Sequence, residues 1–177
     1  MHRTFKILVS LLLLMASGIA MAQKSAGETV DDTWLHTKVK GALVGYGTSG
    51  INLEVYHGVV QMAGFVKSET EKKAAEDQAW SVEGVKEIRN RLVVQTASRS
   101  AGTTLDDGIV AGRVKSALSD DERTSAFDIN VEVRSGVVLL SGFVKDYGEG
   151  QVAVEVARAV EGVEDVINGT DVPPEDL

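Results

Sequence analysis

Apolar and polar residues alternate with two periods along residues 31–94, and together they predict a small α+β unit. Apolar residues recur at helical spacing from Asp31 to about Val44, whereas Ile51 to Tyr56 alternates apolar and polar residues, as in a half-buried strand. His57-Gly58 predicts a two-residue hairpin turn, because Gly tolerates positive φ. The rest of the pattern predicts a second strand, a helix that opens with the capping-box spacing of Ser68 and Glu71, and a third strand, over 59–66, 68–82 and 85–94.

The same pattern occurs twice, which identifies the chain as a tandem duplication. A shift of 78 positions aligns 51–67 with 129–145, and 11 of these 17 positions are identical. Upstream the shift is 75, which aligns Asp31-Asp32 with Asp106-Asp107. Glycines align as well: Gly58, Gly64 and Gly84 correspond to Gly136, Gly142 and Gly162.

The second copy predicts the same order of elements. A helix is expected over 105–119, two strands flank Ser135-Gly136, a helix runs from Asp146 to about Val160, and a last strand covers 163–170. Residues 95–104 are rich in Ser, Thr and Gly and predict a flexible linker. We therefore expect an α+β fold of two tandem small domains, at 31–94 and 105–172, followed by a tail at 173–177. Each domain has the order helix-strand-strand-helix-strand, with two helices on one face of a three-stranded sheet.

The first 22 residues have the features of a secretory signal peptide: a basic head, an apolar run and a small-residue cleavage pattern ending at Ala22. A membrane anchor is the alternative, but it needs about 20 unbroken apolar residues, and Ser17-Gly18 interrupts this run. We expect cleavage after Ala22 and a periplasmic protein that starts with a short segment, 23–30. Because the chain has no cysteine, we expect neither a lipoprotein nor disulfides.

Charge distinguishes the two copies. The 177 residues include 18 Lys+Arg and 26 Asp+Glu, a net charge of −8, which argues against nucleic acid as a partner. Residues 23–97 carry a net charge of −1 and residues 98–177 a net charge of −9. Since anionic lipid attracts basic side chains, a membrane would meet the first domain, where the headgroup candidates are Lys86, Arg89 and Arg91. Ordinary solubilising charge is the simpler interpretation.

The repeated unit resembles the BON domain, named for bacterial osmotically inducible and nodulation proteins. The resemblance rests on the hairpin glycine, the glycine that closes the second strand, the glycine that stops the second helix, and Asn90 and Asn168 in the last strand. It implies a non-catalytic envelope module, associated with osmotic or envelope stress, that contacts phospholipid or other proteins. We interpret Gly58, Gly64, Gly84, Gly136, Gly142 and Gly162 as structural.

Motifs for catalysis are lacking in the sequence, which contains no nucleophile elbow, phosphate loop or Glu-flanked His pair. We therefore expect no enzyme, no catalytic residue and no cofactor. Asp32 and His36 are four residues apart on a predicted helix, a spacing that suits two metal ligands. A third ligand and a counterpart of the pair in the second copy are both missing, so a solvated helix face is preferred and a metal site is the weakest hypothesis.

Two helices cover only one face of a three-stranded sheet, so each domain is expected to leave the other face open. Strand alternation directs Val59 and Phe65 of the first domain, and Val137, Leu139 and Phe143 of the second, toward that face. Contiguous apolar surface usually marks an interface. Either the two copies cover each other, or the faces dock acyl chains or other proteins, with unfolded or envelope proteins as the expected partners. The preferred function is holdase-like protection of the envelope; the alternative is peripheral phospholipid binding through the first domain.

Overall fold

The structure, a computed structural model, describes residues 31–44, 50–96 and 101–174. The signal peptide, the segment 23–30 and the end of the C-terminal tail lie outside the described residues. Residues Asp32–Leu177 form one compact unit.

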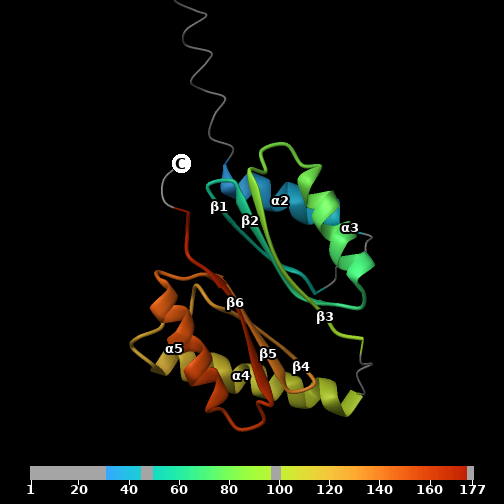
Figure 1. Cartoon of the computed structure of the whole chain (residues 1–177). Coiled ribbons are helices and arrows are strands. Elements are labelled where there is room, and N and C mark those ends of the chain that lie inside the picture. The colour runs from blue at the N-terminus through green and yellow to red at the C-terminus, as the bar shows by residue number, and fades with distance from the viewer. Residues whose placement is uncertain (1–30, 45–49, 97–100, 175–177) are drawn as a thin grey trace, which may run out of the picture. The chain divides into compact units, whose positions relative to one another are not determined.

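Both repeats have the predicted α-β-β-α-β order (Figure 1). The first repeat consists of α2 (Asp32–Leu43), β1 (Asn52–Tyr56), β2 (Val59–Val66), α3 (Glu69–Trp80) and β3 (Glu87–Val94). The second consists of α4 (Ala101–Asp120), β4 (Asn130–Arg134), β5 (Val137–Phe143), α5 (Tyr147–Arg158) and β6 (Asp165–Asp171).

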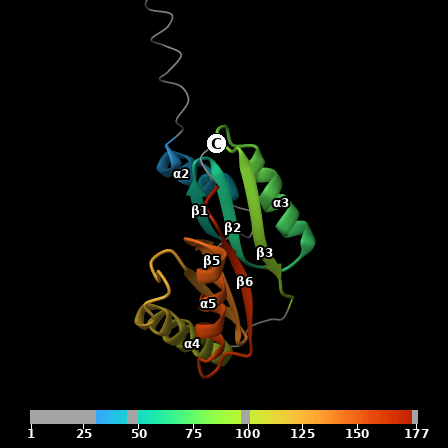
Figure 2. The same ribbon diagram turned by 60° about the vertical axis from the view of Figure 1, so that its left-hand side comes forward.

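Each repeat forms a mixed three-stranded sheet with two helices on one side. The strand orders are β1-β2-β3 and β4-β5-β6, and in each sheet the first pair is antiparallel and the second parallel. In the turned view as well, both helices of a repeat lie on the same side of that repeat's sheet (Figure 2). Each helix layer packs on its own apolar core, which in the first repeat includes Leu35, Val39, Val60 and Met62. The predicted α+β class is confirmed.

The hairpin of each repeat is held by an aspartate from the preceding helix. His57-Gly58 and Ser135-Gly136 all have positive φ, as a tight two-residue turn between antiparallel strands requires. The Asp32 carboxylate accepts the N–H groups of both residues of the first turn, at 2.7 and 2.9 Å. Asp107 accepts the equivalent N–H groups of the second turn, at 2.9 and 3.0 Å. The duplicated aspartates therefore fix the helix against the sheet.

The six glycines singled out in the sequence all have positive φ. The requirement is sterically strongest at Gly142, where a Cβ atom would overlap the backbone oxygen of Asp128. Gly64 stands in the same relation to the backbone oxygen of Gly50. In both repeats a side chain here would push the central strand away from the segment that leads into the first strand.

The main difference from the predicted elements is the start of the second repeat. Helix α4 begins at Ala101, so the last residues of the expected linker, 101–104, are helical. Thr104 and Asp107 have the spacing of a capping box, but the Asp107 carboxylate binds the N–H groups of the hairpin turn. The other helix and strand ends lie within a few residues of their predicted positions.

Candidate functional site

The sheet faces that the helices leave open are covered, because the two repeats pack on each other through them. Strand β2 is buried on both of its faces along its whole length. Phe65 is 6% exposed and Leu139 is 1% exposed, and both belong to an apolar cluster shared by the two sheets, together with Ala63, Val93, Val137 and Ile167. Val59 is also buried, and Phe143 is partly buried. A partner could reach this surface only after the sheets had separated.

Contacts between the repeats are reciprocal. The Asn52 amide donates to Glu132 at 3.5 Å, and the corresponding Asn130 amide donates to Glu54 at 2.9 Å. The aromatic rings follow the same rule: Arg134 lies over Phe65, and Tyr56, which corresponds to Arg134, packs on Phe143. In each case, a contact from the first repeat to the second is matched by the equivalent contact from the second repeat to the first. Such reciprocal contacts are typical of a two-fold relation, here between two copies on one chain.

One residue breaks this symmetry at the centre of the contact. Gln61 is 1% exposed, and its counterpart in the second repeat is Leu139. Its side-chain amide group donates to the backbone oxygens of Gly142 and Gly169 and to the carboxylate of Asp171, at 3.3, 3.1 and 2.7 Å. Its side-chain oxygen accepts the N–H of Gly142 at 2.6 Å. A buried glutamine of the first repeat is thus satisfied entirely by the second, which fixes how the sheets pair.

Asp171 connects this glutamine to two arginines of the first repeat. Arg91 donates to the Asp171 carboxylate through Nε at 3.1 Å and through a second nitrogen, and Arg89 lies 3.8 Å from it. Burial alone would raise the pKa of Asp171, but the hydrogen bonds from Arg91 and Gln61 and the charge of both arginines outweigh it and lower the pKa below its usual value. The carboxylate is therefore charged in the contact at neutral pH.

The predicted lipid-headgroup residues are not equally available. Arg89 also donates to the backbone oxygen of Val172 at 2.6 Å and contacts Glu87, and its side chain is 18% exposed. A phosphate would have to compete with Asp171 and Glu87 for Arg89, and with Asp171 for Arg91. Lys86 is exposed.

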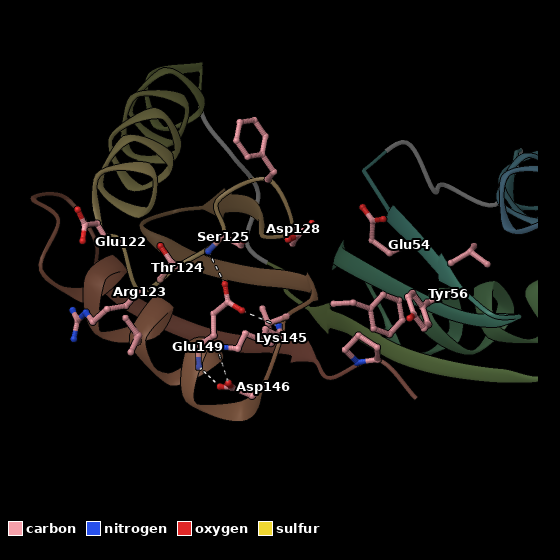
Figure 3. Close-up of a pocket in the computed structure, with 16 residues that line it drawn as sticks. Glu54, Tyr56, Glu122, Arg123, Thr124, Ser125, Asp128, Lys145, Asp146 and Glu149 are labelled. Carbon is pink, nitrogen blue, oxygen red and sulfur yellow. Dashed lines mark hydrogen bonds and ion pairs between the residues drawn. The ribbon is translucent and has the colours of Figure 1, made fainter. Parts of the chain in front are cut away.

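A groove with a volume of about 610 Å³ lies between the repeats, next to this contact. Its walls come from β1, from the loop 121–129 and from the junction of β5 with α5 (Figure 3). Glu54 and Asp128 reach it from opposite sides (Figure 3). Phe127, at its edge, is fully exposed. The polar lining is Glu54, Glu122, Arg123, Thr124, Ser125, Asp128, Lys145, Asp146 and Glu149, with Tyr56, Phe143 and Pro173 among the other walls.

Several of these polar groups serve the fold. Glu149 is a buried residue, 8% exposed, and its carboxylate accepts the N–H groups of Ser125 and Lys145 at 2.6 and 2.8 Å (Figure 3). Asp146 caps α5 by accepting the N–H of Glu149 at 2.9 Å, and this bond lowers the pKa of Asp146. Glu149 thus ties the loop 121–129 to the start of α5, and this tie shapes the groove.

The two basic side chains of the lining have acidic neighbours. Hydrogen bonds from the side chain and backbone of Arg123 lower the pKa of Asp121 to about 2. Lys145 lies 3.7 Å from Asp146. Within the described parts of the chain, none of the ion pairs includes Glu54, Glu122 or Asp128. Three carboxylates of the groove therefore lack a basic partner in those parts.

The described residues contain no group of three or more His, Cys, Asp or Glu side chains arranged to hold a metal ion. Asp32, one of the two residues of the hypothetical metal site, binds the first hairpin with both of its carboxylate oxygens. In the same part of the chain, every helix is too short or too polar to cross a bilayer.

Sequence reasoning missed Gln61, Asp171 and the exposed ring of Phe127. A signal existed for Gln61, because it is the polar residue in a strand whose other outward positions are apolar. The sequence offered no comparable signal for Asp171, whose partners Arg91 and Gln61 lie 80 and 110 residues away along the chain.

Comparison with known proteins agrees with this fold. The model of the BON domain matches the chain twice, over residues 31–96 and 106–174. The chain belongs to the BON domain family. This BON protein is 31% identical over 151 residues to osmotically-inducible protein Y of Escherichia coli, a match that covers 83% of the chain and 75% of the relative. It is 30% identical over 157 residues to the outer membrane lipoprotein DolP of Haemophilus influenzae, covering 86% of the chain and 80% of the relative.

A solved structure is also similar to the chain. It is the C-terminal domain of CdsD, a structural protein of the type III secretion system of Chlamydia trachomatis. The identity is 16%, the match covers 82% of the chain and 68% of that structure, and the TM-score is 0.35.

Proposed function

We propose that this BON protein protects the bacterial envelope under osmotic or related stress by holding segments of other proteins, without catalysis. Its relatives support the setting: one is named as osmotically inducible and another as an outer membrane lipoprotein. The signal peptide expected from the sequence supports export to the periplasm.

The observation that carries this proposal is the exposed aromatic ring of Phe127 at the groove, together with the exposed ring of Tyr147 at the start of α5. Phe127, at the groove, is fully exposed, and Tyr147, which directly follows the lining residue Asp146, is 80% exposed. Aromatic rings beside a cleft between domains are typical of binding sites, because they bury large apolar area on contact. The open sheet faces are less accessible for this role, since they cover each other.

The proposal is tested by the aggregation of a chemically unfolded client, followed by light scattering with and without the mature protein. We expect the protein to slow aggregation, and the Phe127→Ser, Tyr147→Ser double variant to lose most of this effect. Ile109→Ser, which removes an exposed apolar side chain from α4, is the control and should protect normally. Circular dichroism checks that all variants fold. Failure of the wild-type protein to slow aggregation would refute the proposal.

A second candidate function, peripheral phospholipid binding through the first repeat, is favoured by its helix layer. Trp34 on α2 and Trp80 on α3 are 44% and 49% exposed, and the Lys38 ammonium lies 5.3 Å from the Trp34 ring centroid. Tryptophan beside lysine suits the boundary between lipid headgroups and acyl chains. Trp34→Ser should then weaken co-sedimentation with anionic vesicles, whereas Lys86→Gln tests the headgroup residue that remains exposed. Absence of sedimentation at low salt would exclude this function.

A further inference from the structure

We propose that the groove between the repeats binds basic, extended segments of other protein chains. This inference rests on the proposed holding of protein segments, and it names the kind of segment and the residues that select it.

The first argument is charge complementarity. Five carboxylates and two basic side chains line the groove, a net charge of −3. Because Arg123 has Asp121 and Lys145 has Asp146 as neighbours, the basic residues do not neutralise the carboxylates of Glu54, Glu122 and Asp128. Carboxylates placed on opposite sides of a groove suit Lys or Arg side chains on a ligand that lies between them.

The second argument comes from the difference between the repeats. Glu54 corresponds to Glu132, and the residue two positions further along the same face of the strand is Tyr56 in the first repeat and Arg134 in the second. The second repeat therefore carries its own cation two residues from that carboxylate on the same strand, and the Arg134 guanidinium lies 5.5 Å from the Phe65 ring centroid. At the groove the corresponding cation is absent from β1, and a ligand can provide it.

The third argument concerns the shape of the ligand. Glu54, Val55 and Tyr56 lie on β1, which is an edge strand of its sheet. An edge strand offers backbone hydrogen-bonding groups to an extended chain, and side chains that alternate along the ligand then reach the groove at every second position. The exposed ring of Phe127 offers apolar contact to the stems of Lys or Arg, or to an apolar residue between them.

The test uses three short fluorescent peptides that alternate valine with arginine, glutamine or glutamate, and it measures their binding to the mature protein by anisotropy. We expect the arginine peptide to bind, the glutamine peptide to bind more weakly and the glutamate peptide not to bind. Binding of the arginine peptide should weaken when salt is raised, because salt screens exposed charges. Equal binding of all three peptides would overturn the inference.

Substitutions of lining residues test whether the peptide binds in the groove. Glu54→Gln with Asp128→Asn removes two carboxylates that have no ion-pair partner among the described residues, and it should weaken binding of the arginine peptide about fivefold or more. Glu83→Gln with Asp106→Asn makes the same change in net charge at exposed residues outside the lining and is the matched control. Phe127→Ser should weaken the binding of all peptides that bind. Unchanged affinity in the Glu54, Asp128 double variant would also overturn the inference.

The outcomes separate this inference from the proposed function. Slowed aggregation of clients together with peptide binding that ignores charge would refute the basic segment and leave the holding function. Charge-selective peptide binding without any effect on client aggregation would support the site and refute the holding function. Anionic vesicles should not bind at this acidic groove, so vesicle binding that is lost in the double variant would contradict the inference.

Discussion

Replacing Gln61 by leucine, the residue at the corresponding position of the second repeat, should uncouple the two repeats. The change leaves the buried N–H of Gly142 without its acceptor and removes one donor from the carboxylate of Asp171. An unpaired buried amide costs about 1–3 kcal/mol, and a lost hydrogen bond to a charged group about 1.5–3 kcal/mol. The similar size of leucine offsets part of this loss through apolar contact. We expect a net loss of about 3 kcal/mol from the contact.

The position of the tryptophans makes this loss measurable. Both of them, Trp34 and Trp80, belong to the first repeat, so their fluorescence reports unfolding of that repeat alone. Far-ultraviolet circular dichroism reports both repeats. In urea, the wild-type protein should give coincident transitions with the two probes, because the repeats stabilise each other. In the Gln61→Leu variant the two transitions should separate, since the separate cores of the repeats remain intact.

Gln151→Leu is the matched control, because Gln151 is exposed on α5. It should change the free energy of unfolding by less than about 0.5 kcal/mol and keep the transitions coincident. Coincident transitions and an unchanged midpoint in Gln61→Leu would refute the role assigned to the buried glutamine.

Three further predictions concern stability. The pKa of Asp171 is lowered in the folded chain, so the stabilisation by its carboxylate is complete above about pH 4 and is lost as pH falls through the folded pKa. The difference in unfolding free energy between wild type and Asp171→Asn should therefore shrink in acid. A difference that stays constant with pH would contradict this. Asp107→Ala should cost about 2 kcal/mol in urea unfolding by removing two hairpin hydrogen bonds, whereas Asp106→Ala, at an exposed neighbour, should cost little. Gly142→Ala should lower the free energy of unfolding by about 2 kcal/mol or more, because Gly142 has positive φ and a Cβ atom there would overlap a backbone oxygen. Gly112→Ala, in open space within α4, should raise the free energy of unfolding by about 1 kcal/mol. Changes of the same sign in both variants would be inconsistent with the structure.

Local patterns were sufficient to predict the fold of each repeat. Alternation over 51–56 and the hairpin glycine determine strand, turn and strand, and the duplication checks each assignment against a second copy. The start of α4 was predicted too late because Ala101 to Thr104 has a composition typical of linkers. Propensity is weak there, and its outcome depends on how the rest of the helix packs.

The functional surface was harder to predict, because it depends on how the two repeats pack. Arg89 and Arg91 look like free surface charges in the sequence, and only the three-dimensional contact brings Asp171 to them. Strand alternation predicts which residues face away from the helices, while sequence alone leaves open whether another repeat or another protein covers them. The groove follows from the same packing, since β1 and the loop 121–129 belong to different repeats.

The reciprocal pairing of the repeats has a consequence for concentration. Two copies of one domain that meet through corresponding faces would ordinarily form a dimer that dissociates on dilution, but here a short segment between Val94 and Ala101 joins them and keeps each at an effective concentration of about millimolar. Their contact therefore does not depend on how much protein a cell makes. In a pair of two first repeats, Val93 would take the place of Asp171 and leave Gln61 without its charged partner. Divergence of the copies thus favours pairing within the chain and disfavours open-ended association between chains.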